Sequence, residues 1–176
     1  MAFTEPQNNI EQFDLDNGMF VADMGAGSGA YAVAVAKKIG SDGKVYAIEV
    51  QKELLDKIRH SAEVEHLFNV EVIWGDIEKV GGTKLGVASM DAVIVSNVLF
   101  QAEEKDNLIK EAYRILKANR RVLFVDWISS SGGLGPLDEQ IVSPDTAKEI
   151  FTRNGFEFEK DIYAGDHHYG MIFRKK

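Results

Sequence analysis

Asp23-Met24-Gly25-Ala26-Gly27-Ser28-Gly29 is the stretch of this sequence that decides the fold. It follows an apolar run over residues 19–22 and precedes a helix-like stretch over residues 30–39. A strand that ends in a glycine-rich turn and continues into a helix brings unhindered backbone N–H groups and the positive end of the helix dipole to one place. Glycine also permits φ > 0 and close approach of a ligand to the main chain. The stretch therefore predicts a nucleotide-binding turn.

The turn alone leaves several interpretations open, because Gly25, Gly27 and Ala30 also satisfy the Gly-x-Gly-x-x-Gly/Ala fingerprint of dinucleotide-binding proteins. A glycine-rich turn without a ligand is one of them. The next unit favours a ligand, since a short apolar strand over residues 44–48 ends at Glu49, twenty residues after Gly29. A carboxylate in that place accepts hydrogen bonds from the ribose hydroxyls of a nucleoside held over the first turn.

Composition and charge exclude several classes of protein. The sequence has 176 residues, of which 45% are hydrophobic and 27% charged, as in one globular domain with its own core. Its net charge of −8 disfavours nucleic acid and anionic membrane surfaces as partners, since both attract clustered Lys and Arg. The sequence has no cysteine, which excludes disulfides, thiolate nucleophiles and Cys-ligated zinc, and we expect no metal site. It starts Met-Ala-Phe-Thr-Glu-Pro, unlike a signal peptide, and has no bilayer-length apolar run, so we expect a cytoplasmic protein.

Strand-like and helix-like segments alternate along the chain, which predicts a mostly parallel sheet with helices on both faces. Residues 1–18 are expected to form a short amino-terminal cap segment, followed by a single domain over residues 19–176. The expected strands are 20–24, 44–49, 69–74, 90–96 and 121–127. The expected helices are 29–39, 51–66 and 103–117, and a further helix that opens at Ser143-Pro144, where proline suits the first turn.

The alternation stops near the carboxyl end of the chain. Two β-like runs over residues 156–162 and 168–174 are separated only by residues 163–167, too few for a crossover helix. They predict an antiparallel hairpin. A nicotinamide-binding Rossmann domain instead continues to alternate strands with helices. The hairpin therefore disfavours a nicotinamide-dependent oxidoreductase, which we keep as an alternative.

Three more stretches are informative: Trp74-Gly75-Asp76-Ile77, the strand-like run over 90–99, and Glu111-Ala112-Tyr113-Arg114-Ile115-Leu116-Lys117. Together with the glycine turn and Glu49, they resemble the class I S-adenosylmethionine-dependent methyltransferases, in particular small members with a type 11 or type 25 pattern. The resemblance covers residues 19–176. It implies a doubly wound, Rossmann-like α/β fold with a seven-stranded sheet in the order 3-2-1-4-5-7-6, strand 7 being antiparallel.

The resemblance also implies an enzyme that binds S-adenosylmethionine and releases S-adenosylhomocysteine. In the family, the glycine turn contacts the methionine part of the cofactor, and the acid at Asp23 helps to place its amino group. The acid at Glu49 binds the ribose, and the acid at Asp76 accepts a hydrogen bond from the adenine amine. The cofactor-binding residues predicted in this way are Asp23, Gly25, Ala26, Gly27, Gly29, Glu49, Val50, Gly75, Asp76, Ile77, Ser96 and Asn97. Taken singly, Asp76 also suits a helix N-cap, Glu49 a solvated strand end and Asn97 a turn.

The sequence departs from the family pattern before the fifth strand. Where family members usually carry Pro-Gly-Gly, this chain has Lys117-Ala118-Asn119-Arg120-Arg121. Asparagine tolerates the left-handed conformation that such a turn requires, and arginine does so less readily. Because this turn lies at the amino edge of the sheet, the departure concerns turn stability more than chemistry.

The predicted topology also locates a methyl-acceptor pocket, since an antiparallel strand seven begins at the edge where strands four and five end. The predicted acceptor residues are Asn97, Asp126, Trp127, His168 and Tyr169. Loop 132–136 is the expected lid. His167 and His168 are the candidate general bases, because histidine titrates near neutral pH, although a hydrogen-bonded hairpin histidine is the plainer interpretation of each. Tyr31 is expected either to pack in its helix or to border the sulfonium.

Methyl transfer is an in-line displacement, so alignment of the reactants and exclusion of water supply most of the acceleration. The sequence lacks the Asn/Asp-Pro-Pro-Tyr of exocyclic-amine methylation and the cysteines on which arsenite methylation relies in similar proteins. We therefore favour a small organic acceptor, with a protein side chain second and a non-catalytic S-adenosylmethionine-binding regulatory protein as a further alternative. The short amino-terminal segment predicts a pocket that is open, completed by a partner subunit in a homodimer, or closed only on ligand binding.

Overall fold

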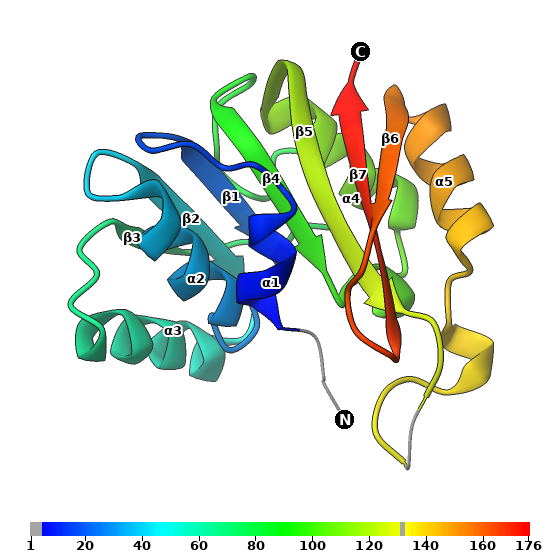
Figure 1. Ribbon diagram of the computed structural model, residues 1–176, viewed down its shortest axis with the longest axis horizontal. Coiled ribbons are helices and arrows are strands. Elements are labelled where there is room, and N and C mark those ends of the chain that lie inside the picture. Colours follow the sequence, from blue (N-terminus) through cyan, green and yellow to red (C-terminus); the bar gives the residue numbers. More distant parts are fainter. Residues whose placement is uncertain (1–4, 131–132) are drawn as a thin grey trace.

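The centre of the structure is a seven-stranded sheet in the order β3-β2-β1-β4-β5-β7-β6 (Figure 1). The computed structural model describes residues 5–130 and 133–176. The strands are β1 (Phe20–Met24), β2 (Lys44–Glu49), β3 (Val70–Trp74), β4 (Met90–Ser96), β5 (Leu116–Trp127), β6 (Phe156–Ile162) and β7 (His168–Lys175). Neighbouring strands run parallel, except that β7 is antiparallel to both β5 and β6. The strand order and the terminal hairpin confirm the predicted fold class.

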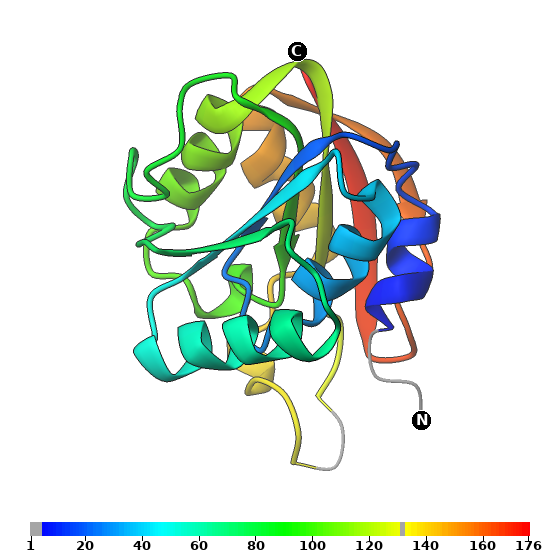
Figure 2. The same cartoon turned by 90° about the vertical axis from the view of Figure 1, so that its left-hand side faces the viewer.

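Helices cover both faces of the sheet (Figure 2). The helices are α1 (Pro6–Glu11), α2 (Ala30–Ile39), α3 (Lys52–Val64), α4 (Lys105–Ile115) and α5 (Pro144–Arg153), with the 3₁₀ turns η1 (Leu99–Gln101) and η2 (Asp138–Gln140). Alternate residues of β4 point to opposite layers, as the period of a strand requires. Val93 and Val95 pack with α4 and α5, whereas Ala92 and Ile94 pack with α1 and α2.

The described part of the amino-terminal segment is packed into the domain. Ile10 and Phe13 are buried in the same apolar cluster as α2. The side-chain amide of Gln12 pairs with the backbone of Tyr163 in the β6–β7 loop, donating at 2.9 Å and accepting at 3.2 Å. α1 and the hairpin loop are therefore joined, while the predicted boundary after residue 18 stays a prediction.

Strand β5 begins at Leu116, five residues before its predicted start. The pairing of β5 with β4 changes register over residues 117–120, which the sequence pattern had indicated as a turn. Asn119 has φ 61°, so asparagine takes the left-handed conformation, as expected. The Lys117 ammonium lies 2.8 Å from Asp91 Oδ1 and fixes this bulge to the start of β4.

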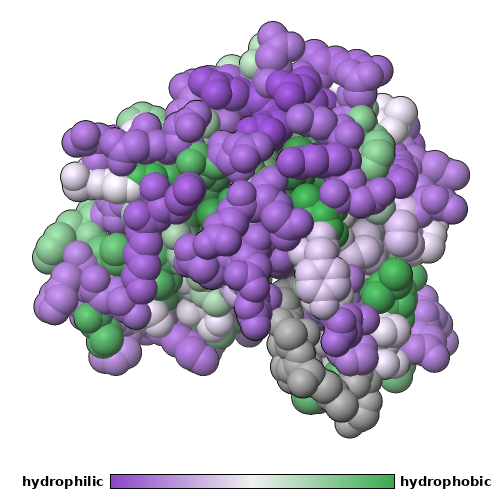
Figure 3. All heavy atoms as spheres, in the orientation of Figure 1, coloured by the Kyte–Doolittle hydropathy of each residue, from purple (hydrophilic) through white to green (hydrophobic). Residues whose placement is uncertain are grey.

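On the face seen in Figure 3, the described surface is mostly hydrophilic, and hydrophobic side chains lie in separate groups. None of the helices in the described residues is long and apolar enough to cross a membrane.

Candidate cofactor site

A cavity of about 520 Å³ opens where the first four strands of the sheet end. Every predicted cofactor residue except Gly29 lines it. Gly29 is the residue before α2, and a methyl group on it would lie 3.1 Å from Ile58 Cγ1 in α3. Its small size therefore allows α3 to pack closely against the start of α2.

The glycine turn folds tightly against the end of β2. The N–H groups of Gly25 and Ala26 both donate to Ile48 O at 2.9 Å. Gly25 and Gly27 have φ of 78° and 55°, in the left-handed region. A methyl group on Gly25 would lie 2.5 Å from Val98 Cγ1, so only glycine fits this position.

Glu49 is buried at the end of β2 and joins two turns of the site. Its Oε2 accepts the N–H of Gly27 at 3.0 Å, and its Oε1 accepts the N–H groups of Val50 and Gln51 at 2.9 and 3.0 Å. A carboxylate offers about four lone-pair sites. Glu49 thus keeps capacity for one more donor from the cavity, as a ribose hydroxyl would supply.

Asp23, at the end of β1, is only 2% exposed, and its Oδ2 has no hydrogen-bond partner among the described residues. Burial raises the pKa of Asp23 to about 7, opposed by a hydrogen bond from the Ala32 backbone and reinforced by the negative charge of Glu49. An unpartnered buried carboxyl oxygen is costly, and a cationic ligand would relieve that cost.

The end of β4 and the residue that follows it contribute two more polar atoms to the cavity. Ser96 Oγ and Asn97 Oδ1 are buried and have no partner within the described part of the chain. Asn97 has φ 56°, a conformation that non-glycine residues seldom adopt and that concentrates at functional sites. Its N–H donates to Val125 O at 2.9 Å, which holds the residue at the end of the sheet.

The loop after β3 supplies Gly75, Asp76 and Ile77 to the cavity wall. No helix begins at Asp76; its Oδ1 instead accepts the N–H of Glu78 at 3.0 Å, in an Asx turn. Its Oδ2 lies 3.2 Å from the Lys79 ammonium. The N-cap interpretation is therefore wrong, and Asp76 faces the cavity from a turn.

Several lining residues were not among the predicted site residues. Tyr31 lies in the cavity wall, and its hydroxyl accepts a hydrogen bond from the buried amide of Asn9 at 2.7 Å. Pro6, Leu54 and Gln101 also line the cavity. Tyr31, in α2, was expected either to pack in its helix or to border the sulfonium. Pro6, Leu54 and Gln101 carry no sequence signal, because only the packing of α1, α3 and η1 beside the sheet brings them there.

Four of the five predicted acceptor residues do not line the cavity, namely Asp126, Trp127, His168 and Tyr169. His168 is 5% exposed, and neither ring nitrogen has a partner among the described residues. Its ring centroid is 4.1 Å from that of Trp127. Burial lowers the pKa of His168 to about 4, with a smaller contribution from the charge of His167. His167 Nδ1 lies 3.2 Å from Ser129 Oγ.

Asp126 and Tyr169 have partners inside the protein. The Asp126 carboxylate accepts the N–H groups of Phe100 at 3.1 Å and of Trp127 at 2.8 Å, and burial raises its pKa to about 6. The Tyr169 hydroxyl donates to Val142 O at 2.7 Å. Of the predicted acceptor residues, only Asn97 lines the cavity.

The predicted lid over residues 132–136 is only partly visible, because Gly132 lies outside the described residues. Gly135 packs on Trp127, where an added methyl group would lie 2.9 Å from Cζ3. Lid closure stays a prediction. Within the described residues, no group of three or more histidine or acidic side chains is placed to hold a metal ion.

Comparisons with known proteins agree with this geometry. A protein-family model described as a methyltransferase domain matches residues 15–162. An arsenite methyltransferase from Aquipseudomonas alcaligenes is 30% identical over 114 residues, which is 62% of this chain and 33% of that protein. A protein-L-isoaspartate O-methyltransferase from Methanococcus maripaludis is 41% identical over 66 residues, 38% of this chain and 31% of that protein. The chain thus spans about a third of the length of these curated relatives.

The crystal structure of an S-adenosylmethionine-dependent methyltransferase from Aquifex aeolicus superposes with a TM-score of 0.88. The two sequences are 26% identical, and the match covers 98% of this chain and 90% of that one.

Proposed function

The chain belongs to the methyltransferase-domain family, whose model matches residues 15–162, and we propose that it transfers a methyl group from S-adenosylmethionine to a small organic molecule. The observation that carries the proposal is the buried, unpartnered oxygen of Asp23 beside the glycine turn. S-adenosylmethionine presents an ammonium group and a sulfonium, and both are positively charged. The described residues supply no partner for this Asp23 oxygen, and the ammonium group of the cofactor would provide one.

The charge of the cavity wall supports the same cofactor. Four of the described lining residues are acidic, namely Asp23, Glu49, Asp76 and Glu78, and none is Lys or Arg. Opposite charges within a partly buried site attract strongly, and like charges repel. The pyrophosphate of a nicotinamide dinucleotide would meet these carboxylates and no cationic side chain of the described lining. The cavity therefore favours the cationic S-adenosylmethionine over NAD.

The chain's own residues would bind and orient the cofactor. The backbone at Gly25 and Gly27 leaves room for the methionine part, Asp23 would pair with its ammonium, and Glu49 has capacity for a ribose hydroxyl. Asp76 and Ile77 would contact the adenine. S-adenosylmethionine supplies, when bound, a methyl group activated by its positively charged sulfur. The protein's contribution is alignment of the acceptor and exclusion of water.

The remaining lining residues favour a small polar acceptor. Tyr31, Ser96, Asn97 and Gln101 are uncharged hydrogen-bonding residues in the same cavity wall as Asp23. Arsenite is disfavoured, because the sequence has no cysteine. A protein side chain is the second candidate acceptor.

His167 and His168 remain the proposed general bases. The low pKa of His168 makes it a weak proton acceptor near neutral pH, so His167 is the first residue to test. Trp127 packs on His168, and none of Trp127, Asp126 and Tyr169 lines the cavity.

Calorimetric titration with S-adenosylmethionine, S-adenosylhomocysteine and NAD tests the cofactor. We expect the first two to bind and NAD not to bind; the reverse result would favour an oxidoreductase. A screen of small molecules with methyl-labelled cofactor tests the transfer itself. A protein that binds the cofactor but labels no acceptor in such a screen would match the regulatory alternative.

A further inference from the structure

The segment that joins β3 to β4, residues 75–89, contains no helix or strand. Its first residues, Gly75, Asp76, Ile77 and Glu78, line the cavity. A few turn hydrogen bonds lie within the segment, such as that from the Gly82 N–H to Lys79 O at 2.8 Å. It has no continuous hydrogen-bond ladder, so its remaining backbone groups need partners outside it. The position of Asp76 in the site therefore depends on what supports this segment.

Helix α4 and the residues around it bind the segment at both ends. Near its start, Glu78 Oε2 accepts the N–H groups of Glu103 and Glu104, each at 2.8 Å, just before α4. At its end, the N–H of Ala88 donates to Arg114 O at 2.9 Å. These contacts fix the two ends and leave the middle to a third attachment.

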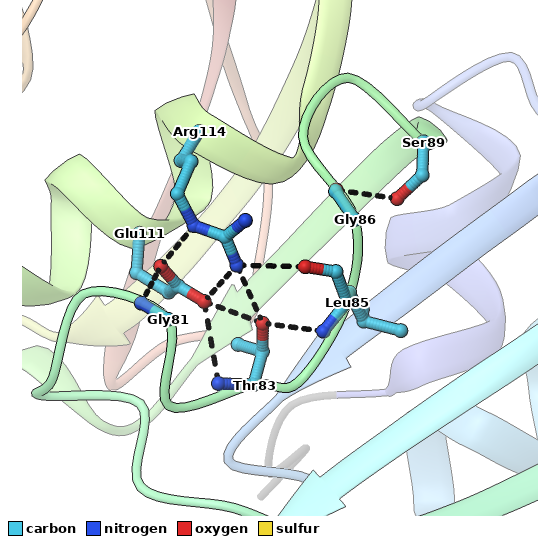
Figure 4. Close-up of polar contacts among 7 residues, drawn as sticks. All are labelled: Gly81, Thr83, Leu85, Gly86, Ser89, Glu111 and Arg114. Carbon is cyan, nitrogen blue, oxygen red and sulfur yellow. Dashed lines mark hydrogen bonds and ion pairs between the residues drawn. The ribbon is translucent and has the colours of Figure 1, made fainter.

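The third attachment is the buried carboxylate of Glu111 in α4 (Figure 4). Its Oε2 accepts the N–H of Gly81 at 2.7 Å, and its Oε1 accepts the N–H of Thr83 at 3.2 Å. Arg114 binds both oxygens, with Nε at 2.8 Å and a terminal nitrogen at 2.7 Å, and also donates to Leu85 O. The guanidinium neutralises the carboxylate, so a charged group is tolerated in this buried place.

Glu111 thus accepts hydrogen bonds from the residues on either side of Gly82. Gly82 itself packs against the backbone of Asp76. A methyl group on Gly82 would be 1.9 Å from Asp76 O, and one on Gly75 would be 2.6 Å from Gly82 O. No side chain intervenes between these backbones. A loss of order at Gly82 therefore removes this support from the backbone of Asp76.

We propose that Glu111 is a positioning residue for the cofactor: by holding Gly81 and Thr83, it fixes Asp76 and Ile77 in the wall of the cavity. Glu111 does not line the cavity and acts only through the segment. The consequence for cofactor affinity rests on the proposed function, whereas the ordering of the segment does not.

The first test measures the segment without any ligand. In Glu111→Gln, an N–H₂ group replaces one acceptor oxygen and faces donors, so at least one hydrogen bond is lost. Hydrogen exchange followed by mass spectrometry should become faster in residues 75–85 and stay unchanged in the glycine turn. The matched control is Asp106→Asn, on the same helix, where Asp106 binds Arg153 of α5 and no residue of the segment. Exchange in the segment that stays as slow in Glu111→Gln as in the wild-type chain would overturn the proposal.

The second test is a double-mutant cycle with S-adenosylhomocysteine as the probe, measured by calorimetry. Glu111→Gln should weaken binding about tenfold, in the range found for residues of one hydrogen-bonded network, and Asp106→Asn should not. In the Asp76→Asn background, the same change at Glu111 should have little further effect. An equal loss in both backgrounds would show that Glu111 does not act through Asp76.

If Glu111→Gln does not fold, Thr83→Val serves instead, since it removes the hydroxyl that donates to Glu111 and that accepts weak hydrogen bonds from the Leu85 N–H and from Arg114, and leaves the carboxylate itself in place. It should give a smaller change of the same kind in exchange and in affinity, and no change in either would overturn the proposal. Failure of the wild-type chain to bind S-adenosylhomocysteine would count against the proposed function, and the exchange result would still decide the role of Glu111 in ordering the segment.

Discussion

Replacing Asp23 by Asn should abolish a pH dependence that we expect for S-adenosylhomocysteine binding. Because burial raises the pKa of Asp23 to about 7, the carboxyl is roughly one-tenth ionised at pH 6 and nine-tenths ionised at pH 8. Only the ionised form attracts the ammonium group of the ligand. The apparent Kd is the intrinsic Kd divided by the competent fraction, so affinity should rise about tenfold over this interval.

Calorimetric titrations at about pH 6, 7 and 8 would measure this effect, whose size corresponds to about 1.4 kcal/mol. The Asp23→Asn variant should bind with the same weak affinity at all three pH values. Adenosine is the control ligand, because it has no ammonium group and its binding should not follow the charge of Asp23. A flat profile for the wild-type chain, or an unchanged slope in the variant, would refute the assignment of Asp23 to the ammonium.

The same substitution should stabilise the ligand-free protein at neutral pH. The pKa of Asp23 is raised from 3.8 to about 7 in the folded state, so its contribution to stability is present below about pH 4 and lost as the pH rises through about 7. A shift of this size opposes folding at higher pH by a few kcal/mol, on the order of one per pKa unit. Thermal unfolding near pH 8 should give Asp23→Asn a higher Tm, and a lower Tm would contradict the argument from burial.

Four further substitutions test other parts of the site. Glu49→Ala should weaken S-adenosylhomocysteine binding by about 1.5–3 kcal/mol in calorimetry, the range for hydrogen bonds to a charged group. Unaltered affinity would refute the ribose assignment. Gly25→Ala should destabilise the protein by about 1–3 kcal/mol in denaturant unfolding and lower cofactor affinity, because its methyl group meets Val98 and φ is left-handed. Turnover of the His167→Gln and His168→Gln variants at saturating acceptor should fall if either histidine is the base, and an unchanged rate removes both from the chemistry.

The sequence alone determined the order of the elements and the place of the site. The apolar runs predicted the bounds of β1, β2 and β4 as the structure has them. Each of these strands is buried between two layers of helices, so it is largely apolar along its length, and polar or glycine residues at or next to its ends mark its limits in the sequence. The short connection over residues 163–167 allowed no geometry other than a hairpin, and the hairpin is present. The glycine turn and the acid at Glu49 indicated the cavity, since parallel strands end at one edge.

The tertiary structure decided what those residues are able to do. Asp23 and Asp76 are both aspartates at the carboxyl edge of the sheet, Asp23 in β1 and Asp76 after β3. Asp23 is buried with an unpartnered oxygen, whereas Asp76 is held in a turn by Glu78 and Lys79. The early start of β5 follows from its pairing with β4 and not from its own residues. Glu111 reads as an ordinary helix residue until Gly81 and Thr83, about thirty positions away, are seen to bind it. Periodicity is a property of neighbours in the chain, whereas burial, partners and pKa arise from residues far apart in the chain, which only the folded structure brings into contact.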